Sequence, residues 1–576
     1  MTAAGDASGD APGRAAGSPG RVLRGIGVSS GSAHGPVVQV AAPVAPPADE
    51  PPAADPAAAA EQAIAAFMGV ADTLDGRAAT ADDAARDVLK ATAMIARDRS
   101  LHRAVTKHLG EGQGPATAIA SAIDEFAAQF EALGGYFAER VTDLRDVGSR
   151  AIATVLGEPA PGVPHFSEPS VIVAHDLAPA ETATLDRSRV LGIVTAAGGR
   201  TSHTAILAAQ MGIPAVVQAH GATEIPGGTL VSLDGDSGEV VLNPDADAVA
   251  AQLERRERRE RALADVSGPG RTADGHAVAL LANIGGVEDA ELAGAADVEG
   301  VGLFRTEFVF LSAQHAPTVE EQTEIYRRVL APFGSRRVVV RTLDAGADKP
   351  LAFADLGAEE NPALGRRGLR LSQARPELLD AQLQALAAAA HETGADVRVM
   401  APMVATAEEA RWFAERVRAS GLERAGVMIE VPAAALRAEQ VLAEVDFGSL
   451  GTNDLAQYTM AADRMEGELS ELLDPWQPAV LDVIAAAAAG ARAAGKPLGV
   501  CGESAGDPLL ALVLVGLGVS SLSMAAGKAR GVRLALRTHT LEHCERLAAA
   551  ARAAASPETA RAAVREAADP ELLAVL

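Results

Sequence analysis

A histidine in the N-terminal half of the chain, His203, stands in a setting that favours phosphoryl chemistry. The double glycine Gly198–Gly199 follows a short β-branched run and allows the backbone to turn sharply. Thr201 or Ser202 can cap a helix that ends near Gly212, which puts His203 in the first turn. A phosphoryl group on its imidazole would lie near free backbone N–H groups and the positive end of the helix dipole. The pattern predicts that His203 is a nucleophile that takes up a phosphoryl group.

A second group of chemically capable residues lies in the C-terminal half, at or after the ends of short apolar runs. Its members are Arg305, Arg341, Glu430, Asn453, Asp454, Arg464 and Cys501. Arginine offers a planar fork of donors that matches phosphate and carboxylate oxygens. Glu430 and Asp454 can hold Mg²⁺, which prefers a few carboxylates together with substrate oxygens. Asn453 can add a neutral hydrogen bond, and Cys501 can deliver a proton to a carbanion. A phosphorylated carboxylic acid would need such groups.

Each of these residues also has an ordinary structural interpretation. An arginine after a strand is usually part of a surface ion pair, and a lone cysteine is usually a small core residue. An aspartate or asparagine at a strand end often caps the next helix. Complementary groups nevertheless follow five separate apolar runs, which chance rarely produces. This convergence favours one shared site.

The apolar runs themselves predict the architecture that brings these residues together. Eight short runs alternate with longer helix-favouring stretches: 278–284, 300–304, 338–340, 397–400, 426–429, 447–450, 498–500 and 521–524. Eight strand–helix units predict a (β/α)8 barrel, whose active site lies at the carboxyl ends of its strands. Residues 269–576 are therefore expected to form a barrel domain.

The N-terminal half divides into segments of different character. Residues 1–20 are rich in Gly, Ala, Ser, Asp and Pro, which indicates a disordered tail or a misassigned start. Residues 21–56 and 149–245 contain short β-branched runs that predict an α/β domain around His203. Residues 57–148 have apolar positions at helical spacing, which predicts about four helices inserted after the first predicted strand of that domain. The charged residues 246–268 predict a linker helix and hinge. The expected fold class is multidomain α/β.

The overall composition excludes several functional classes. The chain has 576 residues, too many for one compact domain, and 76 acidic against 50 basic side chains give a net charge of -26. Such an acidic chain is a poor binder of nucleic acid. Two cysteines cannot build a secreted disulfide framework, and neither a signal peptide nor an apolar run of membrane-spanning length is evident. A cytoplasmic protein is expected.

Two sequence strings carry a resemblance to a known family. Gly198–Ile206 resembles the phosphohistidine signature of the phosphoenolpyruvate-utilising enzymes. Gly451–Tyr458, with Asp463–Arg464, resembles their second signature. Both strings are long and specific. From about Gly25 to the C-terminal helices, the chain resembles enzyme I of the phosphoenolpyruvate:sugar phosphotransferase system.

The resemblance implies a reaction and its partners. His203 would accept the phosphoryl group of phosphoenolpyruvate and pass it to a histidine of the phosphocarrier protein HPr. Pyruvate would be released, and the reaction would be the first step of sugar uptake by this system. HPr would dock on the helical insert at 57–148, the barrel would form a homodimer, and the histidine domain would swing between substrate and HPr.

The resemblance also implies a role for each barrel residue. Three arginines would hold the phosphate and carboxylate of the substrate: Arg305, Arg341 and Arg464. Asn453 and Asp454 would contact the substrate, Glu430 and Asp454 would bind Mg²⁺, and Cys501 would protonate the enolate. An additional arginine in the string Gly365–Arg367 departs from the family pattern, which leaves the role of Arg367 open.

Two other functions fit parts of this pattern. A dikinase or synthase that uses ATP would share both signatures but would need a large nucleotide-binding domain before the histidine domain. The region before the histidine domain is short and mostly helical, with no glycine-rich phosphate loop that carries a lysine. A catalytically silent paralogue would lack a motif residue, and none is missing. The chain also shows no additional N-terminal sensory domain of the nitrogen-linked relative, which favours the sugar branch.

Overall fold

A computed structural model describes most of the chain, which divides into two compact units, Met1–Arg256 and Glu257–Leu576. The described residues are 20–29, 31–41, 44–79, 83–133, 140–158, 161–164, 166–177, 185, 189–198, 204–205, 208, 211–235, 237–310, 315–346, 351, 353–354, 357, 359–464 and 467–576.

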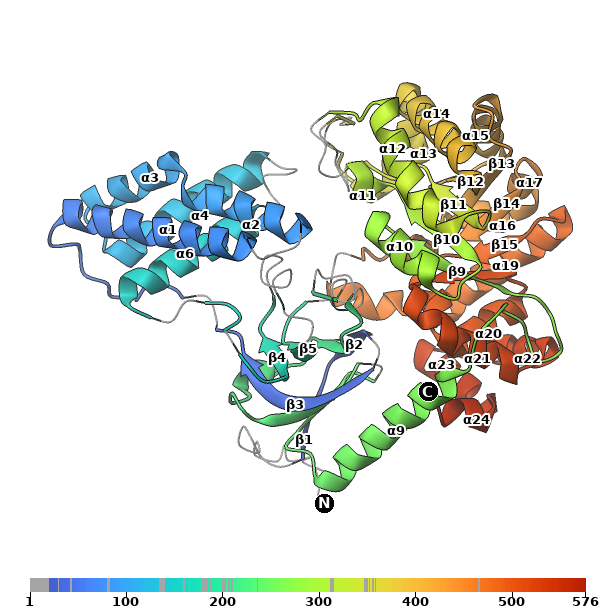
Figure 1. Cartoon of the computed structure of the whole chain (residues 1–576), viewed down its shortest axis with the longest axis horizontal. Coiled ribbons are helices and arrows are strands. Elements are labelled where there is room, and N and C mark those ends of the chain that lie inside the picture. Colours follow the sequence, from blue (N-terminus) through green and yellow to red (C-terminus); the bar gives the residue numbers. More distant parts are fainter. Residues whose placement is uncertain are drawn as a thin grey trace, which may run out of the picture. The chain divides into compact units, whose positions relative to one another are not determined.

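The first unit contains an eight-stranded mixed sheet (Figure 1). Its strands are β1 Arg21–Arg24, β2 Ile26–Ser29, β3 Ser32–Gln39, β4 Ser170–Ala174, β5 Val190–Thr195, β6 Ala215–Val217, β7 Leu230–Asp234 and β8 Glu239–Leu242. Their order is β1-β8-β7-β3-β4-β5-β6-β2, with β3 to β6 paired in parallel. Every residue of β4 is buried, as its β-branched run predicts for a central parallel strand. The runs at 35–40, 171–173, 190–194, 215–217 and 240–242 predict β3, β4, β5, β6 and β8, and no run predicts the other three strands.

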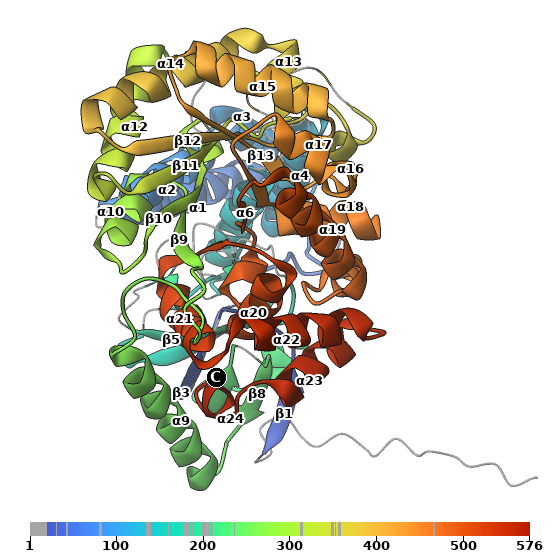
Figure 2. The same ribbon diagram turned by 90° about the vertical axis from the view of Figure 1, so that its right-hand side faces the viewer.

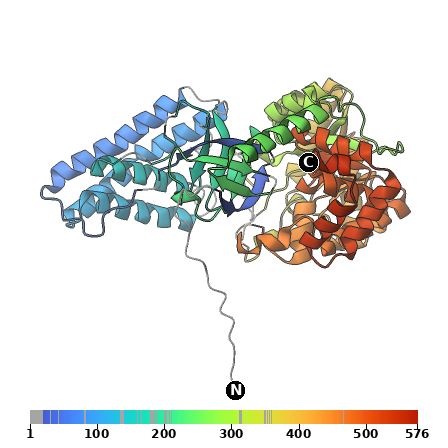
Figure 3. The same ribbon diagram turned by 90° about the horizontal axis from the view of Figure 1, so that it is seen from below.

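A helical bundle is inserted between the parallel neighbours β3 and β4. Its helices are α1 Pro56–Ala78, α2 Asp83–Ala96, α3 Arg99–Gly110, α4 Pro115–Leu133 and α6 Val141–Leu156. Helix α1 packs against α2, α3 and α6, and α4 packs against α3 and α6. Figure 3 shows the helices of the insert, coloured blue to teal, gathered in one bundle. The described part of the insert thus has five helices where the sequence predicts about four. The additional boundary is at Asp98, whose side chain accepts the N–H of Ser100 at 2.6 Å and caps α3.

The second unit is a closed barrel of eight parallel strands, which confirms the predicted (β/α)8 fold. The strands are β9 Ala279–Ile284, β10 Gly300–Arg305, β11 Arg337–Arg341, β12 Asp396–Ala401, β13 Arg424–Ile429, β14 Phe447–Leu450, β15 Leu498–Val500 and β16 Ser521–Met524. Each overlaps one of the eight apolar runs. Closure is made by β16, which pairs with β9.

Helices surround this barrel (Figure 2). Those between strands are α10 Val287–Ala295, α11 Glu307–Phe310, α12 Val319–Leu330, α13 Leu369–Ala374, α14 Pro376–Thr393, α15 Ala407–Ala419, α16 Pro432–Leu436, α17 Ala438–Ala443, α18 Thr452–Met460, α19 Pro478–Ala494 and α20 Pro508–Leu517. After β16 come α21 Ala529–Thr538, α22 Leu541–Ala553, α23 Pro557–Ala567 and α24 Pro570–Leu573. Helix α9, Ala246–Ala264, spans the boundary between the two units, where the sequence predicts a linker helix.

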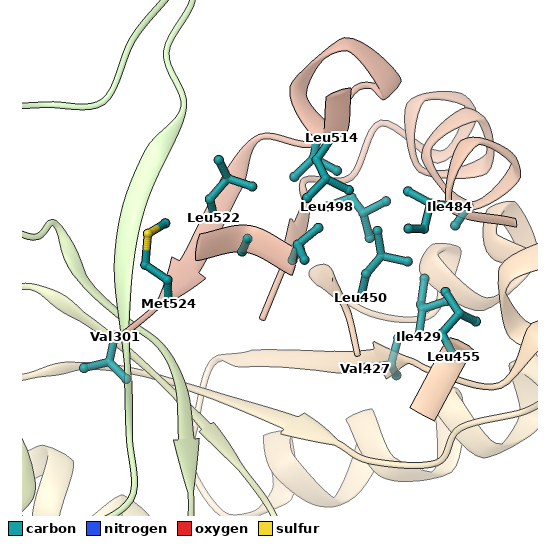
Figure 4. Packing of buried hydrophobic residues seen from close by; sticks show 14 of the residues in the cluster. Val301, Val427, Ile429, Leu450, Leu455, Ile484, Leu498, Leu514, Leu522 and Met524 are labelled. Carbon is teal, nitrogen blue, oxygen red and sulfur yellow. The ribbon is translucent and has the colours of Figure 1, made fainter. Parts of the chain in front are cut away.

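Leucines join the barrel strands to the outer helices (Figure 4). Leu450, Leu498 and Leu522 come from the adjacent strands β14, β15 and β16, and Leu514 and Ile484 meet them from α20 and α19. These side chains are at most 2% exposed, and burial of each contributes about 2 kcal/mol. Helix α20 is apolar on nearly all sides because it lies inside this packing. Among the described residues, no helix is long and apolar enough to cross a membrane.

A buried histidine makes the C-terminal helices sensitive to pH. The Nε2 atom of His539 accepts the N–H of Asp569 at 3.1 Å, so the Nδ1–H must donate to the carbonyl of Ala535, 2.9 Å away. Burial lowers the pKa of His539, and the neighbouring His543 lowers it further. The neutral ring therefore stabilises the fold above about pH 6.5, and this stabilisation is lost as the pH falls.

We expect the melting temperature of the wild type to fall between pH 8 and pH 5. A His539→Gln variant, which cannot titrate at this position, should lose less over the same interval. Thermal unfolding followed by circular dichroism would measure both. An equal loss in the variant would show that other groups cause the acid sensitivity.

Candidate active site

The barrel strands bring the predicted residues to one end of the barrel. Arg305 ends β10 and Arg341 ends β11, and the two residues are direct partners in the register of these strands. Glu430 directly follows β13, and Cys501 directly follows β15. Asn453 and Asp454 lie in the first turn of α18, just after β14. All of them are thus at carboxyl ends of parallel strands, where (β/α)8 barrels bind their substrates.

Arg341 is buried among carboxylates. It forms ion pairs with Glu307, the first residue of α11, and with Asp344, whose Oδ2 is 3.2 Å from its Nη1. Burial alone would lower the pKa of Arg341, but these acidic groups outweigh burial and hold the pKa above its ordinary value. The Nε of Arg341 is buried with no hydrogen-bond partner among the described residues. One donor of the guanidinium therefore has no hydrogen bond within the described part of the chain.

Arg367, whose role the sequence leaves open, lies at the centre of this network. Its side chain is 1% exposed. Nη2 is 3.0 Å from Oδ2 of Asp344, and Nη1 is 3.2 Å from Oδ1 of Asp454. Asp344 thus lies between two arginines, and Asp454 has a second one in Arg464, 3.7 Å away. The Asp454 carboxylate bonds to arginine, which argues against the alternative that it serves as a helix cap.

Glu430 is a fully buried carboxyl group, and only one of its two oxygens has a hydrogen-bond partner among the described residues. Its Oε1 accepts the N–H of Met403 at 2.6 Å, whereas Oε2 has no hydrogen-bond partner among the described residues. Burial raises the pKa of Glu430 to about 8, and the charges of Asp454 and Asp344 add to this effect. A Cβ at Gly451 would lie 2.7 Å from Oε2, so only glycine leaves this oxygen undisturbed. The arrangement suits a ligand with positive charge.

Cys501 lies in the barrel interior, directly after the end of β15. It is 2% exposed, and its Sγ lies 3.5 Å from the carbonyl oxygen of Leu450. It packs among apolar side chains that include Met400 and Met428, so the interpretation as a core residue also holds. Burial raises the pKa of the Cys501 thiol to about 11. The thiol therefore keeps its proton at neutral pH and can give it to a stronger base.

Other predicted residues are more exposed or lie outside the described residues. Arg305, Asn453 and Arg464 are partly exposed at the barrel mouth. His203 is outside the described residues, as are its neighbours from Gly199 to Ser202. Gly212, the predicted helix end, is described and has a left-handed φ of +66°, as a glycine C-cap requires.

The sequence interpretation overlooks two acidic partners. Glu307 and Asp344 stand two and three residues after the predicted arginines Arg305 and Arg341, but no role is assigned to them. A buried arginine needs a counter-ion. An acidic residue two or three positions after each arginine could therefore have been predicted as its ion-pair partner. Among the described residues, no group of three or more His, Cys, Asp or Glu could hold a metal ion. A divalent cation at Glu430 and Asp454 would therefore need oxygens from a substrate or from water.

The chain is similar to known proteins over most of its length. Models of the phosphoenolpyruvate-utilising enzymes match three segments: the N-terminal domain at residues 24–140, the mobile domain at 166–238 and the phosphoenolpyruvate-binding domain at 259–541.

Curated relatives extend the match to nearly the whole chain. A phosphoenolpyruvate-protein phosphotransferase of Streptomyces coelicolor is 51% identical over 94% of this chain and 98% of its own. A protein of the same name from Haloferax volcanii is 42% identical over 76% of this chain and 79% of its own. A multiphosphoryl transfer protein of Xanthomonas campestris is 39% identical over 93% of this chain and 66% of its own. With this barrel, these segments and this identity, the chain belongs to the phosphoenolpyruvate-protein phosphotransferase family of the phosphoenolpyruvate-utilising enzymes.

Proposed function

We propose that this protein transfers the phosphoryl group of phosphoenolpyruvate to His203 and then to a histidine of HPr, with release of pyruvate. The observation that carries the proposal is the buried set of charges at the barrel mouth. Arg341 Nε and Glu430 Oε2 are a buried donor and a buried acceptor that have no hydrogen-bond partner among the described residues. Such groups are costly unless a ligand completes them. A phosphorylated carboxylate with a bound cation has the required oxygens and the required positive charge.

Binding of this substrate depends on arginine. We assign the phosphate and carboxylate of phosphoenolpyruvate to Arg305, Arg341 and Arg464, with Asn453 as a neutral contact. Glu307 and Asp344 hold Arg341 in place, so its planar donors are oriented before the substrate arrives. Phosphoryl transfer needs this positioning and charge neutralisation more than it needs covalent help from the barrel.

Magnesium fits the two carboxylates that the proposal assigns to it. Glu430 has a buried oxygen without a hydrogen-bond partner among the described residues, and burial, followed by the charge of the nearby Asp454, raises the pKa of Glu430, so a cation beside both carboxylates would be favourable. When bound, Mg²⁺ would neutralise phosphate and enolate oxygens.

The chemical step leaves an enolate that must take up a proton. The bond between phosphorus and the enol oxygen breaks while a bond between phosphorus and a ring nitrogen of His203 forms. Cys501, whose pKa is raised to about 11, then protonates the methylene carbon of the enolate to give pyruvate. HPr later takes the phosphoryl group from His203.

The proposal includes further properties that the family resemblance implies. HPr would dock on the inserted bundle of α1 to α6, and the barrel would form a homodimer. The histidine domain would move between the barrel and HPr, with α9 at the hinge. The enzyme would act in the cytoplasm, as the first step of sugar uptake.

Labelling separates this proposal from its competitors. We expect phosphoenolpyruvate labelled at its phosphorus to label the full chain in the presence of Mg²⁺ and the absence of ATP. The label should be labile to acid and stable to base, as a phosphohistidine is, and should move to purified HPr. A requirement for nucleotide would favour a dikinase or synthase. Absence of any label would favour a silent paralogue and would refute the proposal.

A further inference from the structure

We propose that Gln382, which lies outside both family-like strings, is a positioning residue that fixes the two strand ends carrying Arg305 and Arg341. The inference rests on the proposed function, because it assumes that these arginines bind phosphoenolpyruvate. Gln382 is on α14, on the outside of the barrel, and its side chain is 2% exposed. It is part of a buried hydrogen-bond network.

The amide of Gln382 is bonded to both strand ends. Its Oε1 accepts the N–H of Leu343, two residues after Arg341, at 3.0 Å. Its Nε2 donates to Oγ1 of Thr306, the residue after Arg305, at 3.1 Å. The hydroxyl of Thr306 in turn donates to the carbonyl oxygen of Arg341 at 2.8 Å. One side chain therefore joins β10 to β11 at the point where their ladder ends.

Side chains of α12 hold the amide itself. Nε2 of Gln382 also donates to the hydroxyl of Tyr326 at 3.0 Å, and this hydroxyl donates to Oε1 of Gln322 at 3.3 Å. Gln322 donates to the carbonyl oxygen of Pro317 at 2.9 Å. Both residues belong to α12, which packs against α14. Tyr326 of α12 and the two strand ends thus fix the orientation of the Gln382 amide. Both donors of this amide and its acceptor are used.

The position of this network explains why it is needed. Arg305 and Arg341 are direct partners across β10 and β11, so two positive charges stand side by side at the last pair of the ladder. No further pairing of β10 with β11 follows these two residues, so side-chain contacts have to keep the spacing of the strand ends. The hydrogen bonds of Thr306 and Leu343 connect the two strands beyond the last pair of the ladder. Arginines that share one phosphate need such fixed spacing, because small displacements of binding groups reduce rates strongly.

Packing alone does not account for a glutamine at this position. The buried neighbours of Gln382 on α14 include Leu379, Leu383 and Leu386, which fill the core without polar atoms. Burial of a primary amide is unfavourable unless its hydrogen bonds are made. The bonds of Gln382 end on the two strand ends or on Tyr326. This distribution indicates a role in aligning the strand ends.

The test compares two buried substitutions on the same helix in the full-length protein. Gln382→Met keeps the volume and removes the hydrogen bonds, whereas Leu386→Ala opens a cavity in the same layer and leaves the network intact. We expect Gln382→Met to reduce kcat/KM for phosphoenolpyruvate by about tenfold or more, mainly through KM. Leu386→Ala should lower the melting temperature but keep the wild-type KM. An unchanged kcat/KM in Gln382→Met, or an equal rise of KM in Leu386→Ala, would overturn the inference.

A second pair of variants guards against misfolding of Gln382→Met. Thr306→Val is isosteric but lacks the hydroxyl, and Thr306→Ser retains it. The valine variant should show the raised KM and the serine variant should restore a value near that of the wild type. Equal values in both would contradict the role of the hydroxyl.

Two further measurements separate this inference from the proposed function. Phosphoryl transfer from phosphorylated HPr back to His203 uses no barrel residue in the proposal, so Gln382→Met should retain the wild-type rate. Calorimetry with phosphoenolpyruvate and Mg²⁺, done in a His203→Ala background that cannot take up the phosphoryl group, measures binding to the barrel without any transfer. A wild type that binds but is not labelled would refute the proposed function, while weaker binding by Gln382→Met would still support the alignment role. A wild type that does not bind would refute both.

Discussion

Replacing His203 with alanine should abolish labelling of the chain by phosphoenolpyruvate and leave binding of phosphoenolpyruvate intact. No other side chain in the two family-like strings combines a neutral nucleophilic nitrogen with a predicted helix N-terminus. The barrel carries the proposed binding groups, so loss of the acceptor should not weaken the substrate site. Incorporation of labelled phosphorus measures the first quantity, and calorimetry measures the second.

The matched control is His220→Ala. His220 is an exposed histidine in the turn after β6, within the same unit as His203. This variant should be labelled like the wild type, which excludes a general effect of removing an imidazole. Label that persists in His203→Ala would place the phosphoryl group on another residue and would contradict the assignment.

Replacing Arg341 with lysine should lower kcat/KM for phosphoenolpyruvate by about a hundredfold or more. Lysine keeps the positive charge beside Glu307 and Asp344, so the buried carboxylates retain a counter-ion and the fold should stay stable. It removes the planar fork and the buried Nε donor, which we expect to bind the substrate. Initial rates of labelling as a function of phosphoenolpyruvate concentration would measure the effect.

Arg398→Lys provides the control for this substitution. Arg398 lies on β12 of the same barrel and pairs with Asp396 at 2.6 Å, near the amino end of the strand and away from the carboxyl ends that form the candidate site. Its replacement should leave kcat/KM near the wild-type value. In Arg341→Lys, transfer from phosphorylated HPr to His203 should continue at the normal rate. If that half reaction slows as well, the defect extends beyond the barrel site and the assignment of Arg341 to the substrate is wrong.

The barrel could be predicted from the sequence because its signals are local and repeated. Each strand is a short apolar run, and most are followed by a clear helix start such as Thr318 or Thr406, which form capping boxes. The sequence does not predict β1 and β2, because both strands are incompletely buried and neither has a strong apolar pattern. Their place in the sheet depends on partners about 190 to 220 residues away in the sequence.

The candidate site could be predicted only in part, for the same reason. Arg341, Glu430 and Cys501 follow apolar runs directly, so their position at the strand ends is readable from the sequence. Arg367 is 23 residues after Asp344, and Gln382 is 76 residues after Thr306. Their contacts depend on the path of a loop and on which face of α14 meets the barrel. No local pattern encodes these long-range pairings.

The pairing of β9 with β16 has a consequence for the synthesis of this protein on the ribosome. Ala279 pairs with Ser521, which is translated 242 residues later (521 minus 279). The first barrel strand therefore cannot pair on this side until the last strand has been made. At typical elongation rates, this interval lasts roughly 10 to 50 seconds. During that time β9 and the latest strand to emerge remain unpaired edges, which attract other chains. The N-terminal unit is complete before this interval begins, so the nascent barrel is the stage at which misassembly would be most damaging.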